Sequence, residues 1–353
     1  MTSTTLPDAE RAQSDLAETA AWHWLAYESG LSLRRAKAII LDQLQTRKRP
    51  LHDTLSEAPS SWQTALGLTV EEAQMLENQR AQLESVTKTL VGWNQQGLGL
   101  VRWDEPGYPP TLRAHMRPEE QPLLLGYRGE LGLLEMPAVL ALAGSPPDED
   151  AGVWTLETML ELAGEGALPL AVGRAGLDAE LVRALLSAEA PLALALPRGL
   201  ASYSPPPALA AAISSGRALL LSPFRPDWTP PSSEPNPVLA PTLGFAQALA
   251  NALLIITPPH PQNLLPEQPC FLRPGIPKTV GCQSYYSDPE TLFLRLVETP
   301  VAAAIANAPS FAPPSPTTPP TPSLDPEKLI DQLSALGNVP EAMKARLRNQ
   351  AND

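Results

Sequence analysis

The sequence predicts a doubly wound, mostly parallel α/β sheet of the Rossmann-like type, preceded by a small all-helical domain. Three observations predict this fold. Short apolar runs alternate with helical patterns through the middle of the chain, as βαβ units do. The residues before them show only helical periodicity. The run PAVLALAG breaks on Gly144-Ser145, as a central strand does at the ligand-binding edge of an open sheet.

Periodicity and composition divide the chain into five segments. We expect a disordered tail over 1–15, a helical domain over 16–90, the Rossmann-like domain over 91–300, a proline-rich linker over 301–324 and short helices over 325–353.

The helical segment contains two helix–turn–helix units. Ser32 is placed to cap a helix in the first unit, and Thr69 and Glu72 have capping-box spacing in the second. One apolar face of the first unit is marked by Trp22, Leu25, Ala26 and Leu33. The pattern is typical of a helix-hairpin-helix or SAM-like domain, which either presents backbone amides to DNA phosphate or serves packing and dimerisation.

The cluster Arg47-Lys48-Arg49 has two interpretations as well. It is either a solvated loop or a phosphate contact.

The elements of the sheet follow in order. Apolar runs predict strands over 97–103, 123–129, 137–144, 168–173, 190–197, 218–224, 252–258 and 270–275. We interpret 123–129 as an edge strand and 137–144 as the first central strand, with a loop over 106–120. Helical patterns predict helices over 151–164, 178–188, 206–215, 240–251 and 288–298. Strands that are apolar throughout indicate a sheet covered on both faces.

Charge and cysteine content narrow the class of protein. The net charge is −13, and residues 91–300 carry 12 Lys and Arg against 21 Asp and Glu, without the basic stripe that is usual in nucleic-acid binders. Cys270 and Cys282 are too few for a disulfide scaffold and are expected to be small buried hydrophobes. The polar N-terminus and the short apolar runs predict a soluble, cytoplasmic protein with no membrane contact.

Candidate ligand contacts gather at the predicted strand ends. Gly144, Ser145 and Gly173 either offer backbone amides to a phosphate or serve the tight turns there. Asp178 is expected to cap a helix. The candidate cations, each of which also fits a surface salt bridge, are Arg174, Arg198, Arg217 and Arg273.

The loop after Gly144-Ser145 disfavours phosphate binding, because it is the rigid and acidic run Pro146 to Asp150. The histidines are scattered, and neither a catalytic triad order nor a Walker loop is present. We therefore expect no enzyme activity, no metal and no cofactor.

The order of these pieces resembles the DNA-processing protein A family (the DprA or Smf proteins). The family's D-x-x-YP-x-x-L, P-x-x-L-x-x-G, VGSR, SGxAxGID and PG…GCN motifs have counterparts, in order, at 104–112, 122–129, 143–146, 172–178 and 274–283. The resemblance spans roughly residues 16–298. It implies single-stranded DNA binding, recombinase loading during natural transformation, and a homodimer.

The chain departs from the family where the family contacts DNA. Pro146 stands in place of the arginine after Gly-Ser, Thr242-Leu243-Gly244 stand in place of an Arg-Asn-Arg turn, and the SGsLxTA helix is replaced by a loop over 258–269. Each lost arginine removes charge and bidentate hydrogen bonding to phosphate.

Three functions therefore stay open: weakened single-stranded DNA binding, a non-catalytic protein-interaction scaffold, and a sensor or enzyme for a small nucleotide in the strand-end crevice. A positive pocket at the strand ends would favour DNA, and a neutral or acidic one would favour the scaffold.

Overall fold

The computed structural model describes residues 8–230, 239–258, 268–278 and 281–297. The chain divides into two compact units, Met1–Ala306 and Asn307–Asp353, and all described residues belong to the first. The predicted linker, the predicted C-terminal helices and most of the predicted loop over 258–269 lie outside the described residues.

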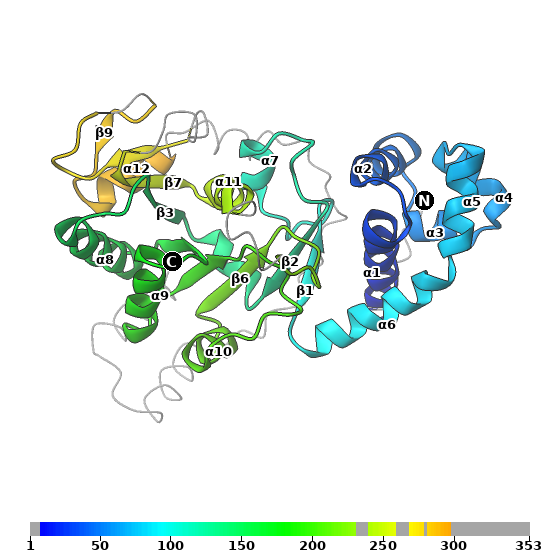
Figure 1. Ribbon diagram of the computed structural model, residues 1–353, viewed down its shortest axis with the longest axis horizontal. Coiled ribbons are helices and arrows are strands. Elements are labelled where there is room, and N and C mark those ends of the chain that lie inside the picture. Colours follow the sequence, from blue (N-terminus) through cyan, green and yellow to red (C-terminus); the bar gives the residue numbers. More distant parts are fainter. Residues whose placement is uncertain (1–7, 231–238, 259–267, 279–280, 298–353) are drawn as a thin grey trace, which may run out of the picture. The chain divides into compact units, whose positions relative to one another are not determined.

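A nine-stranded sheet forms the centre of the second half of this unit (Figure 1). Its order is β1-β2-β6-β5-β4-β3-β7-β8-β9. The strands β3 to β9 are parallel to one another, whereas β2 runs antiparallel to both β1 and β6. The strands are β1 (Gly99–Arg102), β2 (Leu124–Arg128), β3 (Ala138–Ala143), β4 (Leu168–Val172), β5 (Leu192–Ala195), β6 (Ala218–Ser222), β7 (Ala252–Thr257), β8 (Cys270–Leu272) and β9 (Ser284–Tyr285).

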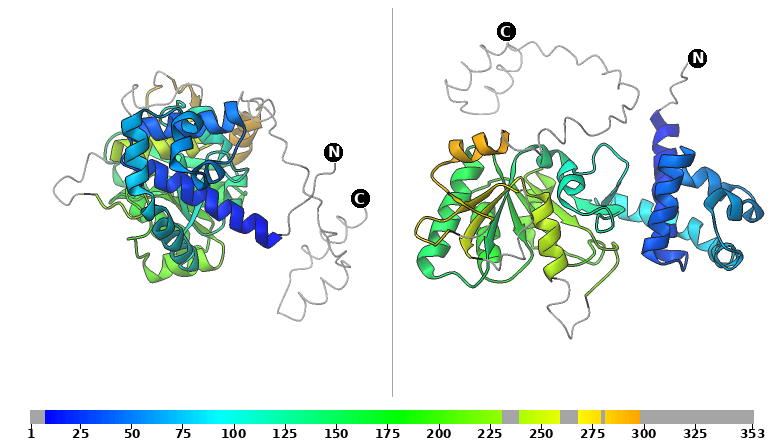
Figure 2. Two further views of the ribbon diagram at one scale, coloured as in Figure 1. Left: turned by 90° about the vertical axis from the view of Figure 1, so that its right-hand side faces the viewer. Right: turned by 90° about the horizontal axis from the view of Figure 1, so that it is seen from above.

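Helices cover both faces of the sheet, so the predicted doubly wound α/β class is confirmed (Figure 2). Side chains of α8 (Glu149–Gly164), α9 (Leu177–Ser187), α10 (Pro207–Ser214) and α12 (Pro289–Val297) pack on one face. Those of α7 (Pro110–His115), η3 (Leu131–Glu135) and α11 (Leu239–Leu249) pack on the other.

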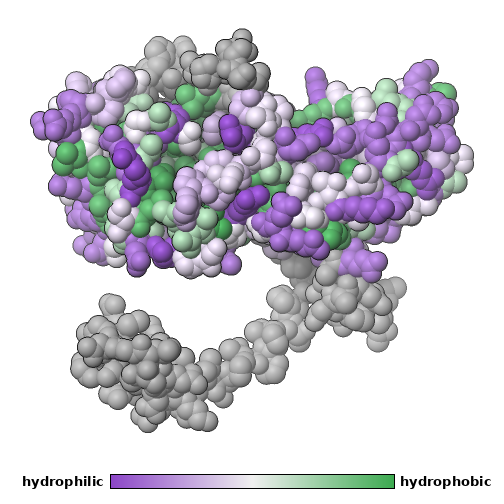
Figure 3. Space-filling model, turned by 60° about the horizontal axis from the view of Figure 1, so that its bottom comes forward, coloured by the Kyte–Doolittle hydropathy of each residue, from purple (hydrophilic) through white to green (hydrophobic). Residues whose placement is uncertain are grey.

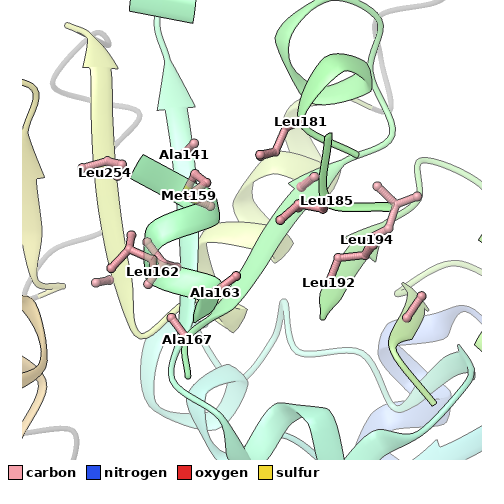
Figure 4. Close-up of a cluster of buried hydrophobic side chains, with 14 of the residues drawn as sticks. Ala141, Met159, Leu162, Ala163, Ala167, Leu181, Leu185, Leu192, Leu194 and Leu254 are labelled. Atoms are coloured by element: carbon pink, nitrogen blue, oxygen red, sulfur yellow. The ribbon is translucent and has the colours of Figure 1, made fainter. Parts of the chain in front are cut away.

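Alternation along the strands produces these two layers. On β3, Val139 and Ala141 belong to one buried cluster, whereas Leu140 and Leu142 belong to the other. Successive side chains of a strand point to opposite faces, so an apolar run fills both layers at once. Figure 4 shows the layer beneath α8 and α9, where leucines of both helices meet the strands. Burying one such leucine stabilises the fold by about 2 kcal/mol.

Residues 8–95 form the helical region. Its elements are α1 (Asp8–His23), η1 (Trp24–Glu28), α2 (Leu33–Asp42), η2 (Gln43–Arg47), α3 (Leu51–Ser56), α4 (Pro59–Leu66), α5 (Val70–Gln79) and α6 (Ala81–Gln95). The caps predicted at Ser32 and Thr69 are both present, and Thr69 and Glu72 form a complete capping box.

The buried carboxylate of Glu18 links two helices of the helical region, α1 and α3. This carboxylate on α1 accepts hydrogen bonds from the backbone N–H groups of Leu51 and His52, both at 2.9 Å, and from Trp22 Nε1 at 2.8 Å. The ring nitrogen Nδ1 of His52 lies 2.7 Å from the second oxygen. Burial raises the pKa of Glu18, whereas these hydrogen bonds together lower it by more than burial raises it. The pKa of Glu18 therefore lies below its usual value.

Four expectations need correction. The helix α1 begins at Asp8, so residues 8–15 are helical rather than part of a tail. The strand β2 is internal, because β1 pairs with its outer side. The segment 106–120 contains the short helix α7. Leu33 is 53% exposed and does not share the buried face of Trp22.

The cysteines form a fifth correction. Cys270 and Cys282 are joined in a disulfide that ties β8 to the turn before β9. Two cysteines 12 residues apart gave no sequence signal for this, because their pairing depends on two strands that come together only in the folded sheet.

Candidate phosphate and nucleic-acid interface at the strand ends

A pocket of about 680 Å³ opens at the carboxyl ends of β3 and β4. Its walls are the loop from Ala143 to Glu149, the first turns of α8, and the segment from Arg174 to Glu180 at the start of α9. Ligands of open α/β sheets bind at this edge, so the pocket stands where the sequence predicts a phosphate site.

The backbone amides of Gly144 and Ser145 are already hydrogen-bonded. The N–H of Gly144 donates to the carbonyl oxygen of Thr257 at 3.1 Å, and the N–H of Ser145 donates to Thr257 Oγ1 at 3.0 Å. The same hydroxyl donates back to the carbonyl oxygen of Ser145 at 2.9 Å. Thr257 ends β7, the strand across the topological switch point from β3. These amides therefore fasten two strands together instead of facing a ligand.

The amino terminus of α8 is occupied by the protein's own carboxylate. Asp148 is the N-cap residue, and its Oδ1 accepts a hydrogen bond from the N–H of Ala151 at 2.8 Å. Glu149 and Asp150 follow in the first turn. The positive end of a helix dipole attracts anions, and here three side-chain carboxylates supply that charge. A phosphate at this position would meet like charge.

Arg174, the cation in the pocket wall, is paired. Its Nε donates to Oδ2 of Asp178, one helical turn further on, and the two side chains are only 22% and 6% exposed. Burial raises the pKa of Asp178, and the hydrogen bond from Arg174 offsets only part of that increase. The predicted salt bridge of Arg174 is confirmed. Asp178 is not the N-cap residue, because Gly176 holds that position with φ of 79°.

The pocket is acidic as a whole. One guanidinium, that of Arg174, and four carboxylates, those of Asp148, Glu149, Asp178 and Glu180, are among the groups of the lining residues. The Gly173 N–H is also engaged, since it donates to the carbonyl oxygen of Ala195 on the neighbouring strand at 2.9 Å. A Cβ at Gly173 would lie 2.8 Å from the side chain of Leu196, so tight packing against the next strand accounts for this glycine.

The remaining predicted arginines do not line this pocket. Arg198 follows β5 and Arg273 follows β8, both at the carboxyl edge but on other strands. Arg217 precedes β6, and its carbonyl oxygen accepts from the N–H of Leu192 at the start of β5, so it lies at the opposite edge. The structure therefore does not bring the four arginines together.

The basic cluster of the helical region is largely neutralised. Arg47 pairs with Asp42 at 2.8 Å and Arg49 pairs with Glu57 at 2.6 Å. Lys48 takes the left-handed conformation that ends η2. These pairs fit the interpretation as a solvated loop.

Sequence reasoning missed Thr257 and a second group of side chains on the same edge. Phe224 and Trp228 stack with ring centroids 5.1 Å apart, in the loop after β6. The N–H of Gly199, next to Arg198, donates to the carbonyl oxygen of Trp228 at 2.8 Å. The contacts of Thr257 with Ser145 and of Trp228 with Gly199 have no local signal, because each depends on which strands are neighbours.

Within the described residues, no three His, Cys, Asp or Glu side chains are grouped closely enough to hold a metal ion. No described helix has the length and apolar content to cross a membrane.

Comparison with known proteins yields structures only. No family model matches the chain, and no curated protein matches it. An X-ray structure of DNA processing protein A from Streptococcus pneumoniae has a TM-score of 0.49 and 15% identity, covering 78% of this chain and 97% of that one. The likeness is to DNA processing protein A. The Helicobacter pylori protein, described for its single-stranded DNA binding mode, has a TM-score of 0.36 and 16% identity, covering 60% and 95%. Both are structures of the family that the motifs resemble.

Proposed function

We propose that this chain is a DNA-processing protein A-like protein that acts as a non-catalytic, protein-binding scaffold and does not bind phosphate in its strand-end pocket. The observation that carries this proposal is the acidic pocket, where Asp148 caps α8 and Asp178 neutralises Arg174. A soluble location in the cytoplasm is part of the same proposal.

Electrostatics support protein over DNA as the partner of this surface. Affinity for nucleic acid comes mostly from phosphate contacts made by Lys and Arg. In the pocket, carboxylates outnumber guanidinium groups. The nucleotide-sensor alternative is weakened by the same facts, because the amides of Gly144 and Ser145 are engaged with Thr257.

A second candidate function, single-stranded DNA binding with recombinase loading, is favoured by a different part of the edge. Arg198 has no ion-pair partner among the described residues and lies beside the loop that carries the Phe224–Trp228 stack. Proteins bind single strands by combining cations with aromatic rings on which bases stack. This candidate takes the recombinase and the homodimer from the family resemblance.

One titration separates the two candidates. We would measure fluorescence anisotropy of a labelled single-stranded oligonucleotide at about 50 mM salt, where electrostatic binding is strong. The scaffold proposal predicts no saturable binding by the wild type. Binding that weakens at least tenfold in Arg198→Ala and Trp228→Ala, but not in the control Arg183→Ala, would favour the second candidate. Arg183 is a suitable control because it is exposed on α9, with no ion-pair partner among the described residues.

A further inference from the structure

One disulfide lies at the outer edge of the sheet. It joins Cys270, the first residue of β8, to Cys282, which stands just before β9. The strand β9 is the last in the order of the sheet. The chain has two cysteines in all, so this pair accounts for every disulfide that the protein can form within itself.

The two cysteines differ in their access to solvent. Cys282 is 1% exposed and belongs to the buried cluster on the face of the sheet that α7 and α11 cover. Cys270 packs against the edge of the same cluster and is only partly buried. A thiolate opens a disulfide by direct attack on one sulfur, and access decides which sulfur it attacks. Attack therefore falls on Cys270.

The strand β9 has few other links to the sheet. It consists of two residues, which pair with Phe271 and Leu272 of β8, and neither of the two is buried. The hydroxyl of Tyr285 donates to the carbonyl oxygen of Ile276 at 2.9 Å, and Lys278 lies over the same ring. One hydrogen bond and one cation–π contact at the surface add only modest stability. The disulfide, two residues before β9, is therefore its main tie.

Beyond β9 the chain is anchored again. Tyr286 is 7% exposed, and its N–H donates to the carbonyl oxygen of Leu272 at 2.9 Å. Its hydroxyl donates to Oε2 of Glu161 on α8 at 3.3 Å, and its ring meets that of Trp154 edge-on. Opening of the disulfide therefore loosens the short stretch before Tyr286 and leaves α8 and α12 in place.

We propose that Cys270 is the site at which a small-molecule thiol of the glutathione class opens this disulfide, with Cys282 as the protected thiol that closes it again. The thiolate attacks Sγ of Cys270, the bond to Cys282 breaks, and Cys282 leaves as a thiolate that takes up a proton. A second thiolate then attacks the sulfur of the first small molecule, so Cys270 is released as a thiolate and the two small molecules leave joined as a disulfide. One disulfide is reduced and two thiols are oxidised.

Burial gives Cys282 its role. A cysteine in an apolar cluster is shielded from external reagents, and the 5.1 Å between the two Cα atoms places it within bonding range of Cys270. Attack by Cys282 on the mixed disulfide at Cys270 expels the small thiol and forms the bond again. The thiol state of the surroundings then controls the order of this edge of the sheet. The inference goes beyond the proposed function.

Two single-cysteine variants test the assignment of roles. Cys282→Ala should take up one glutathione on Cys270 from oxidised glutathione and hold it, since no second cysteine can expel it. Cys270→Ala should react at least about tenfold more slowly in the native state, because its one cysteine is buried. Mass spectrometry of the intact full chain measures both rates. In urea the two variants should react at similar rates, which shows that the native difference comes from burial.

Reduction of the wild type tests the structural consequence. Excess reduced glutathione should open the disulfide in the native full chain and leave its circular dichroism unchanged. Amide hydrogen exchange of peptides that cover β9 should become about tenfold faster or more, while peptides from α8 keep their rates. The matched control is Cys270→Ala/Cys282→Ala, which should exchange as the reduced wild type does and should not respond to glutathione.

Three results would overturn the proposal. They are a disulfide that opens only in urea, equal native reactivity of the two single-cysteine variants, and exchange at β9 that does not change on reduction. The oligonucleotide titration described above plays no part in any of them, so failure of the proposed function and failure of this proposal are distinguishable.

Discussion

Two carboxylates of this molecule are equally buried and have opposite electrostatic behaviour. Glu18 in the helical region is 7% exposed, and Asp178 at the rim of the sheet is 5% exposed. The pKa of Glu18 lies below its usual value, whereas that of Asp178 lies above it. Burial raises the pKa of both. Glu18 accepts hydrogen bonds from two backbone amides and two side chains, while the main partner of Asp178 is Arg174.

The comparison teaches that the number of donors decides what a buried carboxylate does. Glu18 joins α1 to the start of α3, and its negative charge is part of the fold. Asp178 neutralises Arg174, so its negative charge removes a possible phosphate contact from the pocket. Figure 3 shows the two regions in hydropathy colours. On the face drawn there, hydrophilic side chains cover most of the helical region, and apolar ones are interspersed over the sheet.

The largest expected effect is on Glu18. Glu18→Gln puts an amide where backbone N–H groups need an acceptor, and it removes the charge that strengthens these hydrogen bonds. We expect the free energy of unfolding to fall by about 3 kcal/mol. Urea denaturation followed by circular dichroism measures it. Glu84→Gln, which breaks an exposed ion pair with Lys88, should leave the free energy of unfolding nearly unchanged, because solvent screens that pair. Equal effects in the two variants would contradict the special role of Glu18.

Asp148 is an intermediate case, an exposed carboxylate with one backbone hydrogen bond. Asp148→Ala removes the cap of α8 and should lower the free energy of unfolding by about 1 kcal/mol. Asp148→Asn keeps an accepting oxygen and should lower the free energy of unfolding by only about 0.3 kcal/mol. Thermal or urea unfolding distinguishes them, and an alanine variant as stable as the wild type would show that the cap contributes nothing.

The smallest expected change in the free energy of unfolding is at Asp178. The direction in which this change varies with pH is what tests the comparison. Asp178→Asn should cost about 1 kcal/mol or less at neutral pH, because the lost ion pair is offset by the burial cost of the charge. The raised pKa of Asp178 means that the folded state binds its proton more tightly than the unfolded state. Wild-type stability relative to this variant should therefore grow as the pH falls through the raised pKa toward 3.8.

Glu18 should show the reverse dependence. Its folded pKa is lowered, so its contribution is fully present above the ordinary value of 4.5 and is lost as the pH falls through the folded pKa. The difference between wild type and Glu18→Gln should shrink in acid, while the difference for Asp178→Asn grows. Urea denaturation of the three proteins at several pH values measures both slopes. If the stability differences of the two variants from the wild type changed in the same direction with pH, the opposite pKa shifts of Glu18 and Asp178 would be contradicted.

The sequence predicted the sheet well because its strands carry their own signal. Apolar runs such as PAVLALAG predict a strand covered on both faces without reference to any other residue, and the caps at Ser32 and Thr69 are local as well. Gly144, Ser145 and Arg174 were each predicted at the end of a strand, and they share one pocket because the carboxyl ends of parallel strands lie at the same edge of the sheet.

Two of the missed features depend on distant parts of the chain. The partnership of Ser145 with Thr257 spans 112 positions, and the internal place of β2 depends on where β1 folds back. Arg217 was wrongly grouped with the other arginines, because it directly precedes its strand whereas they follow theirs, and in a parallel sheet these positions lie at opposite edges. The exposure of Leu33 was missed because the turn at Gly30 changes the direction of the chain.

The central claim is that the chain's own carboxylates exclude phosphate from the strand-end pocket. Its most direct test is the affinity for a labelled single-stranded oligonucleotide at about 50 mM salt, comparing the wild type with Asp148→Asn/Glu149→Gln/Glu180→Gln and with Arg174→Ala. The account predicts saturable binding by the neutralised variant under conditions where the wild type shows none, and it predicts that Arg174→Ala, like the wild type, shows none. Tight binding by the wild type that Arg174→Ala abolishes would contradict it.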